Sequence, residues 1–145
     1  MTSTDKILRK KAYCVRQALL RSKLWPSSLA GACVTASWLL GELEPGGALK
    51  FGAFHDSTGC LKEHCWFSCG HWGVIDVTAT QFFDKAVRST PVVMRVQNDW
   101  PWIPDSRIQV GHALESWTLA SKKTCQRLLD DSRHLLRATD YHFLE

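Results

Sequence analysis

Hydrophobic residues recur along this chain at two spacings, one typical of helices and the other of strands. A run of apolar residues three and four positions apart predicts a helix over residues 6–23. This run is Leu8, Ala12, Val15 and Leu19. Leu39, Leu40 and Leu43 lie on the stripe of a second helix, which ends before Pro45-Gly46-Gly47. A third, less regular stripe predicts a helix over residues 113–138.

Between the second and third helices the pattern changes to that of strands. Residues 48–55 alternate in character, and residues 64–69 (HCWFSC) and 72–78 (WGVIDVT) are rich in aromatic and β-branched side chains. Residues 91–96 (PVVMRV) form a further short strand. Residues 98–108 contain two Trp-Pro or Ile-Pro steps and are expected to be irregular. The pattern predicts one α+β domain over residues 1–145, with helices packed on an antiparallel sheet of about four strands.

The two strands on either side of Gly70 suggest a hairpin. If the chain folds back at this glycine, His64 lies opposite Asp76, and both point to the same face as Trp66 and Val74. Opposed residues have Cβ atoms about 5 Å apart, which allows a hydrogen bond between imidazole and carboxylate. Such a bond holds a histidine in one tautomer and stabilises its charged form. The register is an assumption, because a slip of one residue would move Asp76 to the other face.

A nucleophile to accompany this pair is found upstream. Cys33 stands where the small-residue loop 29–32 (LAGA) runs into the second helix. A cysteine in the first helical turn meets unpaired N–H groups and the positive end of the helix dipole, which favour the thiolate. The same N–H groups are able to form part of an oxyanion hole. Cys33, His64 and Asp76 are therefore the candidate nucleophile, base and orienting acid, in that chain order.

This order of motifs resembles the papain-like and transglutaminase-like thiol enzymes. Gly31-Ala32-Cys33 followed by Ala36-Ser37 is similar to their nucleophile helix, and His64-Cys65-Trp66 is similar to their H-x-W strand. Residues 74–82 (VIDVTATQF) resemble an I-D-x-T-x-x-Q-F pattern of small bacterial members. The resemblance covers residues 28–82, and three short motifs carry it. It departs from the family at residues 25–28 (WPSS), where many members have a glutamine that serves as an oxyanion donor.

The resemblance implies a papain/transglutaminase-like fold with the catalytic helix and sheet in residues 28–96, between a basic helix (1–25) and a C-terminal helix (112–138). It implies a cysteine-dependent amide hydrolase or acyl transferase of the peptidase, deamidase or transglutaminase type, with no cofactor. The substrate would be a protein or peptide. Small members of this superfamily include bacterial effectors and toxins, for which an inhibitor or immunity protein is an expected partner.

Charge and composition narrow the function classes. Seven of the 18 basic residues lie in residues 6–23, so the net charge of +4 arises from this one helix. Only one aromatic residue, Tyr13, lies among these charges, so we expect a solvated helix face and no nucleic-acid surface. No apolar run is long enough to span a membrane, and residues 1–11 lack the centre of a signal peptide, which predicts a cytoplasmic protein. The six cysteines are then expected to be reduced.

Two alternatives remain open. A zinc-stabilised binding module would use ligands drawn from one short segment, although this segment has no C-x-x-C knuckle. These candidate ligands are Cys60, His64, Cys65, Cys69 and His71. A catalytically inactive papain-like fold would serve as a protein-binding module. Three tryptophans, Trp66, Trp100 and Trp102, are candidates for substrate contact in the enzyme, and the last two for partner contact in the inactive module.

Overall fold

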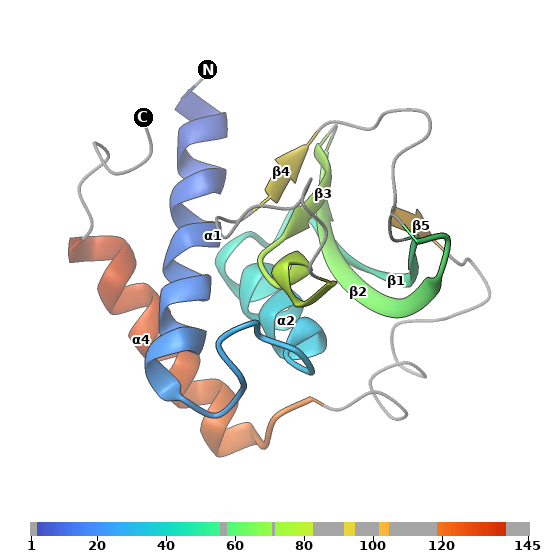
Figure 1. Cartoon of the computed structure of the whole chain (residues 1–145). Helices are drawn as coiled ribbons and strands as arrows, with labels where there is room; N and C mark the ends of the chain where they lie inside the picture. Colours follow the sequence, from blue (N-terminus) through green and yellow to red (C-terminus); the bar gives the residue numbers. More distant parts are fainter. Residues whose placement is uncertain are drawn as a thin grey trace.

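Three helices and one antiparallel sheet make up the part of the chain that the computed structural model describes, residues 3–55, 58–70, 72–82, 92–94, 102–104 and 119–138 (Figure 1). The helices are α1 (Ser3–Ser22), α2 (Cys33–Leu43) and α4 (Lys122–Ala138). The strands are β1 (Ala48–His55), β2 (Leu61–Cys69), β3 (Trp72–Asp76), β4 (Val92–Met94) and β5 (Trp102–Pro104), and a short 3-10 helix, η1 (Ala79–Phe82), follows β3. The strand order is β4-β3-β2-β1-β5. The predicted α+β class is confirmed.

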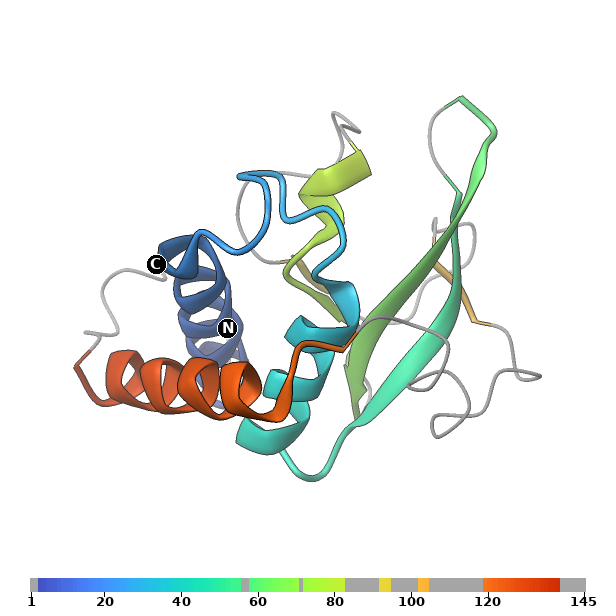
Figure 2. The ribbon, with the colours of Figure 1, turned by 90° about the horizontal axis from the view of Figure 1, so that it is seen from below.

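The helices lie on one side of the sheet, with α2 between the sheet and the pair formed by α1 and α4 (Figures 1 and 2). The four residues of the first apolar stripe are buried and form one core with Leu39 and Leu40 of α2 and Leu128 of α4. Phe67 of β2 and Ile75 of β3 join this core from the sheet. The helical spacing in the sequence therefore identified the faces that pack together.

The C-terminal helix begins later than its apolar pattern suggested. Residues 119–121 are not helical, and α4 starts at Lys122. Ser121 ends the preceding coil as a cap: its carbonyl oxygen accepts a hydrogen bond from the Cys125 N–H at 2.8 Å, and its Oγ accepts one from the Thr124 N–H at 3.2 Å. The predicted helical start is wrong for residues 119–121, and residues 112–118 lie outside the described residues.

The β2–β3 hairpin around Gly70 is present, but its predicted register is wrong. Phe67 pairs with Ile75, whereas a direct pairing of His64 with Asp76 would set Phe67 opposite Gly73. The ladder is also irregular between Phe67 and Cys69, where a bulge takes up extra chain before the turn. Because the displacement is of two residues, it preserves the side-chain alternation, and Asp76 stays on the face of His64.

The expectation of irregular structure over residues 98–108 is wrong for residues 102–104. Trp102–Pro104 is a short edge strand, and Ile103 pairs with Ala53 of β1. An edge position tolerates Pro104, since only one side of the strand needs donors. The approach is close because β1 has a glycine there: a Cβ at Gly52 would collide with the carbonyl oxygen of Ile103. The remainder of 98–108 lies outside the described residues.

No described helix combines the length and the apolar character that crossing a membrane requires.

Candidate active site

Cys33 is the first residue of α2, as predicted, and a tight turn at residues 29–32 directly precedes it. Leu29 and Gly31 have φ angles of 63° and 87°, and the Ala32 N–H donates to the carbonyl of Leu29 at 3.1 Å. The N-cap residue is Ala32, whose side chain makes no capping hydrogen bond. The N–H groups of the first turn, including that of Cys33, thus have no side-chain cap. Cys33 itself is partly exposed.

His64 and Asp76 form a buried pair between β2 and β3. The His64 Nε2 and Asp76 Oδ2 atoms are 2.6 Å apart, and each side chain is 1% exposed. Burial alone would lower the pKa of His64, but the charge of Asp76 and its hydrogen bond outweigh this effect, and the pKa rises to about 9. The imidazole is therefore protonated at neutral pH.

Asp76 is held by hydrogen bonds at both oxygens. Oδ2 accepts from His64 and from the indole Nε1–H of Trp102 at 2.8 Å. Oδ1 accepts from the N–H of Thr78 at 3.0 Å and from its hydroxyl at 3.3 Å. Burial would raise the pKa of Asp76, but the charge of His64 and these hydrogen bonds hold it below its ordinary value. The carboxylate is thus fixed in position and kept ionised.

The turn after β3 explains why the sequence has Thr and Gln after the aspartate. Thr78 closes a turn on the Asp76 side chain, and η1 begins at the next residue. The side-chain amide of Gln81 donates to the Thr78 carbonyl at 2.9 Å and to its hydroxyl at 3.2 Å. Gln81 therefore holds Thr78 in position, and Thr78 in turn holds Asp76.

Cys33 acts on the same imidazole as Asp76. After the larger effects of burial and Asp76, hydrogen bonding to Cys33 and the charge of its sulfur also raise the pKa of His64. Because Nε2 bonds to Asp76, Nδ1 is the ring atom that can exchange a proton with the thiol. The structure pairs His64 with Asp76, and the effect of Cys33 on the pKa of His64 indicates that the sulfur lies near the same imidazole.

Two of the tryptophans proposed for substrate contact, Trp66 and Trp102, pack beside the buried His64–Asp76 pair. Trp66 is 2% exposed, and its ring stacks beside His64 with the ring centroids 6.1 Å apart. Trp102 is 3% exposed and meets Phe54 edge to face at 5.2 Å. Both rings keep water from the His64–Asp76 hydrogen bond. Their contact with substrate stays a prediction, and Trp100 lies outside the described residues.

Arg16 is a residue of this region that sequence reasoning assigned to the solvated side of its helix. It is 6% exposed, and its Nη1 donates to the carbonyl of Val77 at 2.5 Å, next to Asp76. Burial lowers the pKa of its guanidinium, and the charge of Asp76 raises it. The sequence contained a signal for the burial of Arg16: it stands four residues after Ala12 and three before Leu19, on the apolar stripe itself. The solvated face predicted for this helix is wrong at Arg16 and at the buried Lys10.

The described residues give the zinc alternative no set of ligands. No three His, Cys, Asp or Glu side chains among them are grouped so as to hold a metal ion. Cys65 is buried against Val34 of α2 and Phe51 of β1, and burial raises the pKa of its thiol. Cys60 is exposed and directly precedes β2, and His71 lies outside the described residues.

Comparison of the chain with protein-family models, with curated proteins and with solved structures finds no match.

The raised pKa of His64 predicts how stability changes with pH. A histidine whose pKa rises on folding, here from 6.5 to about 9, stabilises the fold fully below pH 6.5, and the stabilisation is lost as the pH rises through 9. We expect the free energy of unfolding to fall by about 2–4 kcal/mol across this window. Urea denaturation at a series of pH values measures it. The decrease should be absent in His64→Gln, and an equal decrease in both proteins would assign it to other groups.

Proposed function

We propose that this chain is a papain-like or transglutaminase-like cysteine enzyme that hydrolyses amide bonds in a protein or peptide through Cys33, His64 and Asp76. The observation that carries the proposal is the buried His64–Asp76 pair, 2.6 Å apart, whose imidazole also responds to a cysteine at the start of a helix. Each feature alone is common in proteins, and their meeting at one imidazole is what favours catalysis.

The reaction begins with a thiolate beside an imidazolium. His64 is protonated at neutral pH, and a cation beside a thiol favours the thiolate. The Cys33 sulfur attacks the substrate carbonyl carbon, a C–S bond forms, and the carbonyl oxygen becomes an oxyanion. The uncapped N–H groups of the first turn of α2 stabilise this oxyanion.

His64 then gives its proton to the leaving nitrogen, the C–N bond breaks, and a thioester remains on Cys33. Neutral His64 takes a proton from water, the resulting hydroxide attacks the thioester, and the carboxylic acid and the thiolate are released. Asp76 stabilises the imidazolium and fixes its orientation throughout. Trp102 and Thr78 hold Asp76 in place through their hydrogen bonds to its two oxygens.

Hydrolysis of a peptide bond or of a glutamine side-chain amide is the preferred form of the reaction, because transamidation needs a second substrate site. The role as a bacterial effector or toxin, with an inhibitor or immunity protein as partner, extends the proposal by analogy with small members of the superfamily. The inactive protein-binding module predicts the same fold without a reactive thiol, so thiol reactivity separates the two.

Competitive labelling of the cysteines tests the proposal. Iodoacetamide is added to the folded protein at mildly acidic pH, where an ordinary thiol reacts slowly, and the modified peptides are mapped by mass spectrometry. We expect Cys33 to react first, ahead of the more exposed Cys60, which is the internal control. Labelling in order of exposure, with Cys60 ahead of Cys33, would reject the enzyme.

A further inference from the structure

A second cysteine, Cys65, lies beside the nucleophile. Cys65 follows His64 in β2 and is completely buried in a cluster with Val34 of α2 and Phe51 of β1. Cys33 packs against the same cluster from the first position of α2. One thiol from a helix and one from a strand therefore meet in a single group of contacting side chains.

Ser37 locates the Cys65 thiol along α2. Burial raises the pKa of Cys65, and a hydrogen bond with the buried Ser37 side chain acts against this effect and lowers it. Ser37 follows Cys33 by four residues, so the two side chains are neighbours on one face of the helix, with Cβ atoms about 5–6 Å apart. Helical side chains lean toward the N-terminal end, so Ser37 holds the thiol on the side of Cys33. The charge of Cys33 also raises the pKa of Cys65, as expected of two neighbouring sulfurs.

The two thiols differ in access to solvent. Cys33 is partly exposed, whereas Cys65 is inaccessible beneath the first turns of α2. The imidazolium of His64 favours the thiolate at Cys33, while burial keeps Cys65 a neutral thiol. A small oxidant in solution therefore reacts first at Cys33, and Cys65 is placed to react with the product.

Cys69 provides a contrast on the same strand and the same face. It lies four residues beyond Cys65, which corresponds to about 13 Å of strand. Burial raises the pKa of Cys69, and the next largest effect comes from Glu44, the residue that ends α2. Cys69 is thus at the opposite end of α2 from Cys33, about 16 Å away along the helix.

We propose that Cys33 and Cys65 form an oxidation site for hydroperoxides, in which a Cys33–Cys65 disulfide reversibly blocks the active site. The inference rests on the reactive thiol of the proposed function and adds the regulation of that site. A disulfide at Cys33 removes the nucleophile, and a reducing thiol restores it. Capture by Cys65 also protects Cys33 from further oxidation to the sulfinic and sulfonic acids, which are irreversible.

Hydrogen peroxide supplies the oxidant in two steps. The Cys33 thiolate attacks one peroxide oxygen, an S–O bond forms, the O–O bond breaks, and the leaving hydroxide takes a proton from His64 to become water. Cys65 then gives up its proton and attacks the sulfur of the sulfenic acid. The S–S bond forms, the S–O bond breaks, and the hydroxide leaves with this proton as a second water. Two thiols are oxidised by two electrons in total, and one peroxide is reduced.

Peroxide treatment of the reduced full-length protein tests the inference. Samples are quenched at intervals with excess iodoacetamide, digested without reductant and mapped by mass spectrometry. We expect a peptide pair joined through Cys33 and Cys65, formed within the monomer, as the first oxidation product. Selective labelling of Cys33 should disappear at the same rate, and dithiothreitol should restore it in full.

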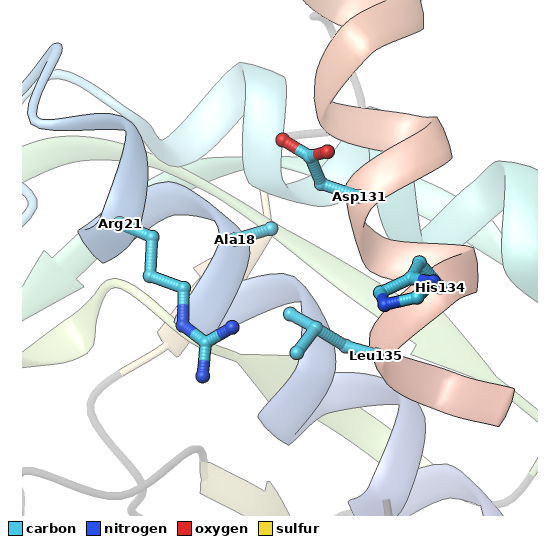
Figure 3. Close-up of a pocket in the computed structure, with 5 residues that line it drawn as sticks. All are labelled: Ala18, Arg21, Asp131, His134 and Leu135. Carbon is cyan, nitrogen blue, oxygen red and sulfur yellow. The ribbon is translucent and has the colours of Figure 1, made fainter. Parts of the chain in front are cut away.

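Variants assign the disulfide to this pair. In Cys65→Ala, checked for folding by circular dichroism, Cys33 should proceed to the sulfinic and sulfonic acids, and dithiothreitol should no longer restore its labelling. Cys69→Ala, the matched control, should form the disulfide as the wild type does. His134→Ala should also leave the oxidation rate unchanged. His134 lines a pocket between α1 and α4, to which neither α2 nor the sheet contributes a residue (Figure 3).

The wild-type protein alone is able to overturn the inference. Irreversible oxidation of Cys33 without a joined peptide, or a disulfide from Cys33 to any cysteine other than Cys65, would do so. So would a Cys65→Ala protein whose labelling dithiothreitol restores as fully as in the wild type. Selective iodoacetamide labelling of Cys33 in the reduced protein would then leave the proposed function standing. If Cys33 shows no such selectivity before oxidation, the proposed function fails first.

Discussion

Replacing Asp76 with asparagine will abolish the selective reactivity of Cys33 and destabilise the fold by about 3–5 kcal/mol. The carboxylate is buried, is the ion partner of His64, and accepts four hydrogen bonds. Removing its charge leaves a buried imidazolium without compensation, so we expect the pKa of His64 to fall and the imidazole to be neutral at pH 7. The imidazolium that should protonate the leaving amine is then missing.

The amide of the new side chain adds a second cost. Its NH₂ group must face either the Trp102 indole N–H or the Thr78 backbone N–H, neither of which can accept, so at least one hydrogen bond is lost in either orientation. Urea denaturation measures the destabilisation, and iodoacetamide labelling at mildly acidic pH measures the loss of thiol reactivity. Asp131→Asn, at an exposed position on α4, is the control and should change neither. A stable Asp76→Asn protein with undiminished Cys33 reactivity would show that the pair is not part of the site.

The second large effect is expected at Arg16. Arg16→Met retains most of the volume but leaves the Val77 carbonyl without its charged donor and removes one of the two cations near Asp76, the other being His64. We expect a destabilisation of about 2–4 kcal/mol. Arg21→Met, on the same helix but exposed, should change stability little. These values come from paired urea denaturation curves.

Arg16 should also affect how the reactivity of Cys33 depends on pH, an effect that a residue with only a packing role would not have. Without the charge of Arg16, the pKa of Asp76 should rise toward its ordinary value. When the protein is acidified, the reactivity of the Cys33 thiol should therefore disappear at a higher pH than in the wild type. Arg16→Lys keeps the charge and should restore the profile in part. If Arg16→Met is as stable as Arg21→Met and has the wild-type profile, the contact with Val77 has no positioning role.

The sequence predicted where Cys33, His64 and Asp76 lie because the signals for these positions are local. A small-residue loop running into an apolar helical stripe placed Cys33 at the start of α2, and strand alternation placed His64 and Asp76 on one face. The predicted register was wrong by two residues, and the face was still right because side chains alternate with a period of two. Hairpin register depends on the bulge between Phe67 and Cys69, which leaves no clear mark in the sequence.

The contacts that sequence reasoning missed are those made by residues from distant segments. Trp102 reaches Asp76 from an edge strand 26 positions away, and Arg16 reaches Val77 from a helix 61 positions away. Neither spacing follows from local propensity, because only the packing of α1 and β5 against the β3 turn creates these contacts. Ser121, in contrast, carried a readable cap signal three residues before Thr124, which would have set the start of α4 correctly.

The most direct measurement of the central claim is the alkylation rate of Cys33 in the wild type and in His64→Gln, at a pH well below 9, where His64 is protonated. Glutamine keeps a donor for Asp76 but carries no charge, so circular dichroism should confirm that the variant is folded before rates are compared. If His64 activates the sulfur of Cys33, the rate at Cys33 drops at least about tenfold while that at Cys60 is unchanged. Equal rates at Cys33 in the two folded proteins would contradict a coupled cysteine, histidine and aspartate.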